Sequence, residues 1–229
     1  MGRYIEIVGE KSSESIADTL INGIFGRVTG DAGSRFVIAI GQAIFLVLFL
    51  ILYGDCIAAR QRIGAVYFFS RISNRKKWIL KEFVWLLFYS VLYTFCFVGM
   101  HMIFSIWGSS EAELSGTLFK VAFQIDLFLT LLLFEMAVLC NLFCAAGGSA
   151  IGILLSMLCV IGLIMCSTAE VDGVLSEMIN PMWLSADIIE NGGSYIQKII
   201  IVFLQTAICA VGTGYYLAKR DLFAREGEG

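Results

Sequence analysis

The sequence predicts an all-α protein, a polytopic helical membrane bundle, and three observations support this fold class. The 229-residue chain is 59% hydrophobic and only 15% charged. Its mean hydropathy is +0.84, and its apolar residues form continuous runs. A helix needs about 20 such residues to cross the hydrocarbon core of a bilayer. A single proline in the whole chain leaves these runs free of helix breaks.

We expect one transmembrane domain over residues 1–229, with five spans and short amphipathic helices. The spans lie at about 36–53, 83–106, 118–143, 149–167 and 196–217. Residues 54–82 form the longest basic loop, with seven of the sixteen Lys and Arg residues. Basic loops stay in the cytoplasm, so the N-terminus is expected outside and the C-terminus inside. Segments 108–116 and 168–195 contain acids but no Lys or Arg, which agrees with this orientation.

Two further segments are expected to hold short amphipathic helices. Residues 1–35 form an outer amphipathic segment with an apolar stripe at Ile16, Ala17, Leu20, Ile21, Ile24 and Phe25. A short helix on the membrane surface or a partly ordered tail would both fit this pattern. Residues 168–195 form an outer helical loop in which Pro181 separates two apolar stretches. Gly148 and Gly152, after the third span, either allow close helix packing or only permit a tight turn.

The sequence offers no pattern for catalysis, for metal binding or for a cofactor held by this chain. It has no GxxxxGK[ST] stretch for phosphates. The sole histidine, His101, is most simply a polar packing residue, and the cysteine pair Cys140 and Cys144 does not complete a metal site. We therefore expect a protein that is not an enzyme. Nucleic acid is not an expected partner, because the basic cluster is short and next to a span.

Two acids stand inside the predicted third span. Asp126 and Glu135 are nine residues apart, which is about half a helical rotation, so they point to opposite faces. Ionisable groups within a span often mark a transport path. The sequence makes both residues candidates for a translocation path, and a protonated carboxyl inside the bundle is the alternative.

The basic loop also carries a candidate contact surface. Ile63, Val66, Tyr67 and Ser70 recur at helical spacing, and Phe68 and Phe69 widen the apolar side. The loop is therefore expected to present a short, basic and aromatic helix to the cytosol.

This layout resembles the permease subunits of ABC-2 type exporters, in particular the small ones associated with bacteriocin or lantibiotic export. The resemblance rests on the loop pattern Arg60-x-x-x-Gly64, then Ser70-Arg71-x-Ser73-x-Arg75-Lys76-Lys77, then Lys81. It also rests on the apolar outer segment before the last span. The family usually has six spans, and here the equivalent of its first is missing. The chain is then either a five-span variant or one that starts late.

The resemblance implies a partner ABC ATPase subunit that binds ATP and pushes on a coupling helix in the 54–82 loop. It assigns Ile63, Val66, Tyr67, Phe68 and Phe69 to the apolar contact. It places Arg60, Arg62 and Arg71 around the rim, although these arginines could instead bind membrane lipid headgroups. It also implies a second permease copy or a related permease, in the cytoplasmic membrane of a bacterial cell.

A second function class fits the same residues. The chain could be a non-transporting accessory or immunity protein that binds a peptide. Acids in the two outer segments would attract a cationic peptide through their field. The two hypotheses differ in whether the cytoplasmic loop binds an ATPase.

Overall fold

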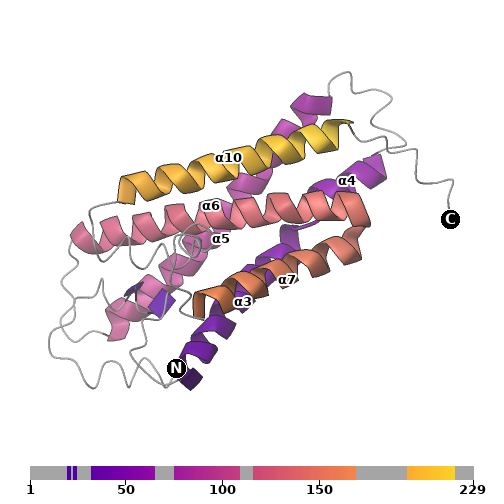
Figure 1. Cartoon of the computed structure of the whole chain (residues 1–229). Helices are drawn as coiled ribbons and strands as arrows, with labels where there is room; N and C mark the ends of the chain where they lie inside the picture. The colour runs from indigo at the N-terminus through magenta and orange to yellow at the C-terminus, as the bar shows by residue number, and fades with distance from the viewer. Residues whose placement is uncertain are drawn as a thin grey trace. The chain divides into compact units, whose positions relative to one another are not determined.

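A computed structural model describes residues 20–21, 23–24, 32–64, 75–108, 116–168 and 195–219. Helices dominate these residues, which include no strand, and the predicted all-α class is confirmed. The helices, labelled in Figure 1, are α3 (Ala32–Tyr53), α4 (Cys56–Gly64), α5 (Arg75–Gly108), α6 (Gly116–Gly147), α7 (Ser149–Thr168) and α10 (Tyr195–Lys219).

Within the described residues, four segments are long and apolar enough to cross a membrane. They are Ile40–Arg62, Arg75–Trp107, Leu118–Gly147 and Ile199–Lys219. The predicted span at 149–167 falls in α7, where Ser149–Gly162 is a shorter apolar helix. The structure is therefore that of a helical membrane bundle.

Helix α5 begins at Arg75, well before the predicted start of its span at residue 83. Lys and Arg are good helix formers, and no Pro or Gly separates the basic residues from the apolar run. The basic residues and the apolar run therefore belong to one continuous helix, and the helix does not begin where the apolar run begins. The 34 residues of α5 would extend about 51 Å, well beyond the hydrocarbon core.

The chain divides into two compact units, and the long helices contribute to both. Unit 1 comprises Met1–Gln42, Val91–Thr130 and Leu163–Ile199. Its described core includes Leu20, Ile21, Ile24, Ile125 and Phe128, all buried. The amide nitrogen of Gln42 donates to the carbonyl of Ile24 at 3.5 Å. The apolar side chains of Leu20, Ile21 and Ile24 are thus buried against protein.

Unit 2 comprises Ala43–Ser90, Leu131–Gly162 and Ile200–Gly229. The fully buried side chains of its core include Phe49, Leu50, Leu86, Leu132, Leu133 and Val138. Ring contacts join its helices. Tyr53 stacks on Tyr89 with centroids 4.9 Å apart, and Phe83 meets Phe134 edge-on at 6.3 Å.

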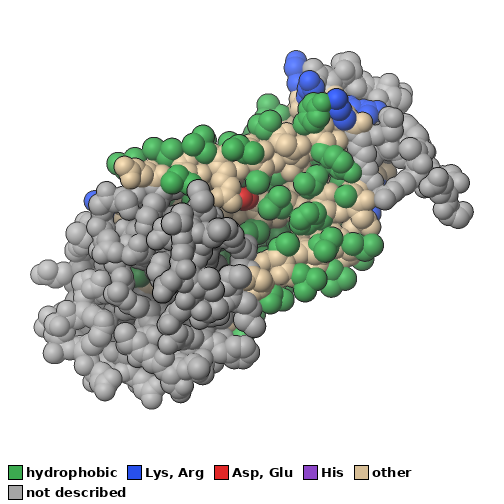
Figure 2. Space-filling model, viewed as in Figure 1, with side chains coloured by type: hydrophobic (Ala, Val, Ile, Leu, Met, Phe, Trp, Pro, Cys, Tyr) green, Lys and Arg blue, Asp and Glu red, His purple; other side chains and the backbone are tan. Residues whose placement is uncertain are grey.

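Helix α6 supplies core residues to both units. Of its apolar window, 72% is buried, against 28% for α5 and 17% for α10. Helices α5 and α10 instead expose large apolar side chains, including Phe95 at 67% and Ile208 at 72%. Figure 2 shows hydrophobic side chains over much of the described face. An apolar surface of this kind matches the lipid contact of spanning helices.

Two glycines shape the α6–α7 connection in different ways. Gly148 has φ of +94°, a left-handed conformation that favours glycine. A Cβ atom on Gly152 would lie 2.3 Å from the backbone nitrogen of Cys144. Gly148 therefore makes the turn, and Gly152 makes the close approach of α7 to α6.

Candidate functional site

Helix α4, the start of the predicted coupling loop, follows α3 after a two-residue turn. A Cβ atom on Gly54 would lie 2.4 Å from the carbonyl oxygen of Leu50 and 2.7 Å from Sγ of Cys140. Only glycine therefore fits at this turn. The carbonyl of Asp55 accepts the first helical bond, from the amide of Ala59 at 2.7 Å, so Asp55 is the N-cap residue of α4.

The first amides of α4 are capped by a side chain from another helix. The side-chain oxygen of Asn141, on α6, accepts bonds from the amides of Ile57 at 2.9 Å and Ala58 at 3.1 Å. Asn141 is fully buried, and its amide nitrogen donates to the carbonyl of Ala137 at 2.8 Å. Its hydrogen-bonding atoms are thus engaged, and the start of α4 is fixed to α6.

An ion pair joins α4 to α5. A guanidinium nitrogen of Arg60 lies 2.5 Å from a carboxylate oxygen of Glu82. The Glu82 side chain is only 9% exposed, whereas that of Arg60 is 52% exposed. The buried carboxylate thus depends on Arg60 for compensation, while water can still reach the arginine.

A second polar connection joins α4 to α7. The guanidinium of Arg62 donates to the hydroxyl of Ser149, the first residue of α7. That hydroxyl donates to the carboxylate of Asp55 at 2.9 Å. Ser149 therefore contacts Asp55 before α4 and Arg62 near its end. Because the Asp55 side chain bonds to Ser149, the first amides of α4 are capped by Asn141 instead.

The structure places only some of the sequence-predicted contact residues. Arg60 and Arg62 lie on α4 and bond to other helices of the same chain. Ile63 belongs to α4, but its side chain lies outside the described residues, as do Val66, Tyr67, Phe68, Phe69 and Arg71. The outer loop at 168–195 is likewise outside them, apart from its first and last residues.

Four residues of this polar network were not singled out by sequence reasoning: Asp55, Glu82, Asn141 and Ser149. A polar asparagine within the apolar run of α6 is the one feature that could have drawn attention in advance. The other three stand at the edges of spans, where polar residues are common.

Glu135, on α6 in unit 2, bonds to the last span. Its side chain is buried. One carboxylate oxygen accepts from the hydroxyl of Thr206 at 3.3 Å, and the other from the thiol of Cys209 at 3.6 Å. Glu135 therefore joins α6 to α10 through polar contacts within the apolar layer.

Asp126, on α6 in unit 1, has a different environment. Its side chain is half-buried. Its Oδ1 atom is buried and has no hydrogen-bond partner among the residues that the structure describes. The side chain of Thr94 forms a hydrogen bond with the Asp126 carboxyl group, and its hydroxyl lies 2.7 Å from that of Thr130. The two acids of α6 thus differ: Glu135 bonds to α10 through both oxygens, whereas Asp126 bonds to Thr94 of α5 and keeps one buried oxygen without a partner among the described residues.

Over the described ranges, no group of three or more His, Cys, Asp and Glu side chains could hold a metal ion. The Cys140 and Cys144 sulfurs lie 3.9 Å apart, within the core of unit 2. The ring of His101 packs against that of Phe97, with centroids 4.6 Å apart.

Comparisons with known proteins found no matching family model, no matching curated protein and no matching solved structure. Function must therefore be inferred from the residues of this chain.

Proposed function

We propose that the protein is a membrane permease subunit of an ABC exporter, in the cytoplasmic membrane of a bacterial cell. A separate ATPase subunit would bind and hydrolyse ATP. This chain would pair with a second permease and change the access of a path through the membrane. The substrate class would be a peptide or an antibiotic. No bond chemistry would occur on this chain.

The observation that carries the proposal is the attachment of α4 to three other helices. Asn141 fixes its start to α6, Arg60 reaches Glu82 on α5, and Arg62 reaches Ser149 on α7. A force on α4 would therefore be transmitted to three helices at once, including the most buried one. A coupling element needs such a connection between a partner subunit and the spans.

This arrangement suggests a division of roles along the basic loop. The arginines of α4 would hold the helix to the bundle, because each already bonds to another helix of this chain. The ATPase contact would then fall to the aromatic residues that follow α4, Tyr67, Phe68 and Phe69. Ile63, Val66 and Arg71 would complete that surface.

The two acids of α6 would also have separate roles. Glu135 would hold α6 to α10 and transmit their relative movement. Asp126 has the unsatisfied oxygen and is the better candidate for a residue that lines the path, since a buried polar atom without a partner often serves a functional purpose.

The test is a pull-down of the tagged chain from native membranes in mild detergent, with partners identified by mass spectrometry. The variant replaces Tyr67, Phe68 and Phe69 with serine. A control variant replaces Phe119 and Phe123 with serine, because both are exposed aromatic residues of α6 in unit 1.

An ATPase retained by the wild type and the control but lost from the loop variant would support the proposal. Recovery of intact chain without any ATPase would contradict it. The accessory or immunity function would then be favoured, and a cationic peptide bound by the purified chain would support that function.

A further inference from the structure

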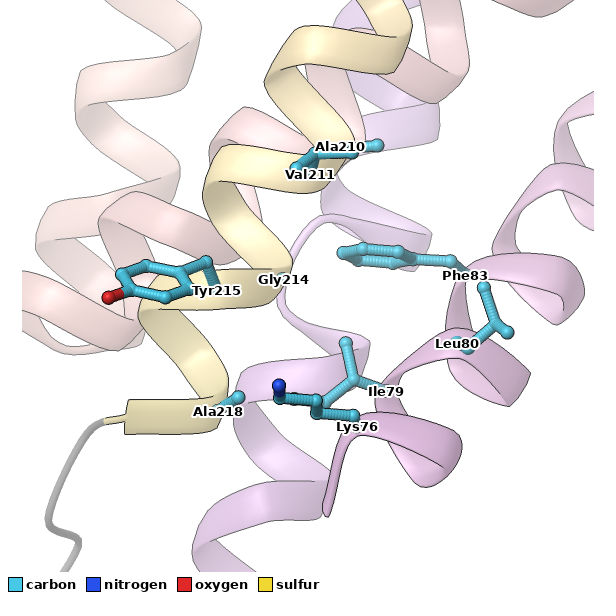
Figure 3. Close-up of a pocket in the computed structure, with 9 residues that line it drawn as sticks. All are labelled: Lys76, Ile79, Leu80, Phe83, Ala210, Val211, Gly214, Tyr215 and Ala218. Atoms are coloured by element: carbon cyan, nitrogen blue, oxygen red, sulfur yellow. The ribbon is translucent and has the colours of Figure 1, made fainter. Parts of the chain in front are cut away.

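The ends of two spanning helices enclose a groove in unit 2 that the proposed function does not use. Its volume is about 340 Å³, near the lower end of the ~300–1,000 Å³ usual for small-molecule sites. Its lining includes Lys76, Ile79 and Phe83 from the start of α5, and Val211, Gly214 and Tyr215 from the end of α10. Figure 3 shows Phe83 extending from α5 toward α10.

The walls of the groove are apolar, and glycine keeps it open. A Cβ atom on Gly214 would lie 3.3 Å from the Phe83 ring, so a larger residue there would narrow the space. Val211 is 73% exposed and Leu80 64% exposed, so the groove opens onto the lipid-facing surface of the bundle. An apolar groove in that position suits an acyl chain.

The mouth of the groove is positively charged. Lys76 extends into the space between α5 and the end of α10 (Figure 3), and its side chain is exposed. The ammonium of Lys219 lies 4.5 Å from the centre of the Tyr215 ring, a cation–π contact at the same end. The lining contains one cation, Lys76, and no acid. Lys219 does not line the groove, but its ammonium lies over the ring of the lining residue Tyr215.

This mouth belongs to the most basic part of the described chain. All Lys and Arg residues that the structure describes in unit 2 lie on α4, on the first two turns of α5 or at the end of α10. Figure 2 shows a group of blue Lys and Arg side chains at the upper right of the described face. Basic residues next to spans face the anionic lipids of the cytoplasmic leaflet.

We infer that this groove is a binding site for one anionic phospholipid. An acyl chain lies along Ile79, Phe83 and Val211, and the headgroup phosphate lies against Lys76. Lys219, held over the lining residue Tyr215, supplies a second cation. Charge complementarity selects this occupant. A neutral helix of a second chain would gain nothing from the two ammonium groups, and a free phosphate would leave the apolar walls uncovered. The site does not depend on an ATPase partner.

Native mass spectrometry of the purified full chain tests the inference, with dioleoyl phosphatidylglycerol as the probe and dioleoyl phosphatidylcholine as the neutral comparison. The Lys76→Gln/Lys219→Gln variant should bind the anionic lipid about twenty-five-fold more weakly, since each lysine contributes roughly fivefold. The control is Lys81→Gln. Lys81 is an exposed lysine on α5 that does not line the groove and, unlike Lys219, is not the cation over the Tyr215 ring.

A second variant, Val211→Trp, fills the groove without changing charge and should also lose the anionic lipid. Its exposed position makes misfolding an unlikely cause, and an unchanged elution volume checks this. Three results would overturn the inference. The neutral lipid could bind as tightly as the anionic lipid, or Lys81→Gln could weaken binding as much as the double lysine variant. Soluble glycerophosphate could also displace the bound lipid. A change from dimer to monomer in Val211→Trp with lipid binding unchanged would likewise overturn it, and would make the groove a contact between copies.

Discussion

The buried side-chain oxygen of Asn141 accepts a bond of 2.9 Å from the backbone amide of Ile57, 84 residues earlier in the chain. Helix caps usually come from the residue that precedes the helix. Here that residue, Asp55, bonds to Ser149, and a distant helix provides the cap. The position of α4 is thereby determined by α6, which gives the first prediction.

Replacing Asn141 with alanine should loosen the start of α4. Two buried amides would lose their acceptor, at a cost of about 1–3 kcal/mol. Hydrogen exchange of the Ile57 and Ala58 amides should become roughly 5- to 150-fold faster. Ser156→Ala is the control, because its buried hydroxyl donates within α7 to Gly152. Unchanged exchange in α4 would show that the cap does not hold the helix.

The ion pair between Arg60 and Glu82 should respond unequally to the loss of each partner. Arg60→Ala leaves a buried carboxylate without compensation and should cost about 1–3 kcal/mol of unfolding free energy. Glu82→Gln leaves a half-exposed arginine that water can solvate, and should cost less than about 1 kcal/mol. Thermal unfolding of both variants and the double variant in detergent measures the difference. If the two single variants lose the same unfolding free energy, the Glu82 carboxylate is in contact with water despite its burial in the structure.

The three glycines Gly148, Gly152 and Gly162 should differ on replacement by alanine. Gly152→Ala should cost at least about 1–3 kcal/mol, because its Cβ would overlap the backbone of α6. Gly148→Ala should cost about 1–2 kcal/mol because of its positive φ. Gly162 has open space around its Cβ position, so Gly162→Ala should be neutral or stabilising by up to ~1 kcal/mol. The order of the three melting temperatures is the test, and a neutral Gly152→Ala would contradict the close contact.

The two acids of α6 should respond differently to leucine. Glu135→Leu removes the acceptor of Thr206 and Cys209 and should destabilise by about 1–3 kcal/mol. Asp126→Leu removes an unsatisfied buried oxygen together with one hydrogen bond from Thr94, so it should change the unfolding free energy by less than about 1 kcal/mol. Thermal unfolding compares them. If Asp126→Leu is the more destabilising change, the Asp126 carboxyl group contributes more to stability than that of Glu135 and is a weaker candidate for the path.

The spans could be predicted from the sequence, because a helix that crosses lipid must be long and apolar whatever it packs against. The turn at Gly148 could also be predicted, because it depends on the glycines of the turn itself and not on distant residues. The start of α5 at Arg75 could not be predicted, because the apolar run begins several residues later, at Phe83. The ion pair between Arg60 and Glu82 could not be predicted from the sequence either, since it depends on how α4 and α5 face each other.

The bonds of Glu135 have a consequence for how the chain is made. Helix α6 leaves the ribosome before α10, which carries Thr206 and Cys209. Until α10 has been synthesised, the carboxyl group of Glu135 lacks both of its partners from that helix, and its transfer into lipid is costly. Helix α10 thus supplies hydrogen-bond donors to Glu135, a residue that is synthesised before it. A chain that ends before α10 would leave this carboxyl group without these hydrogen bonds.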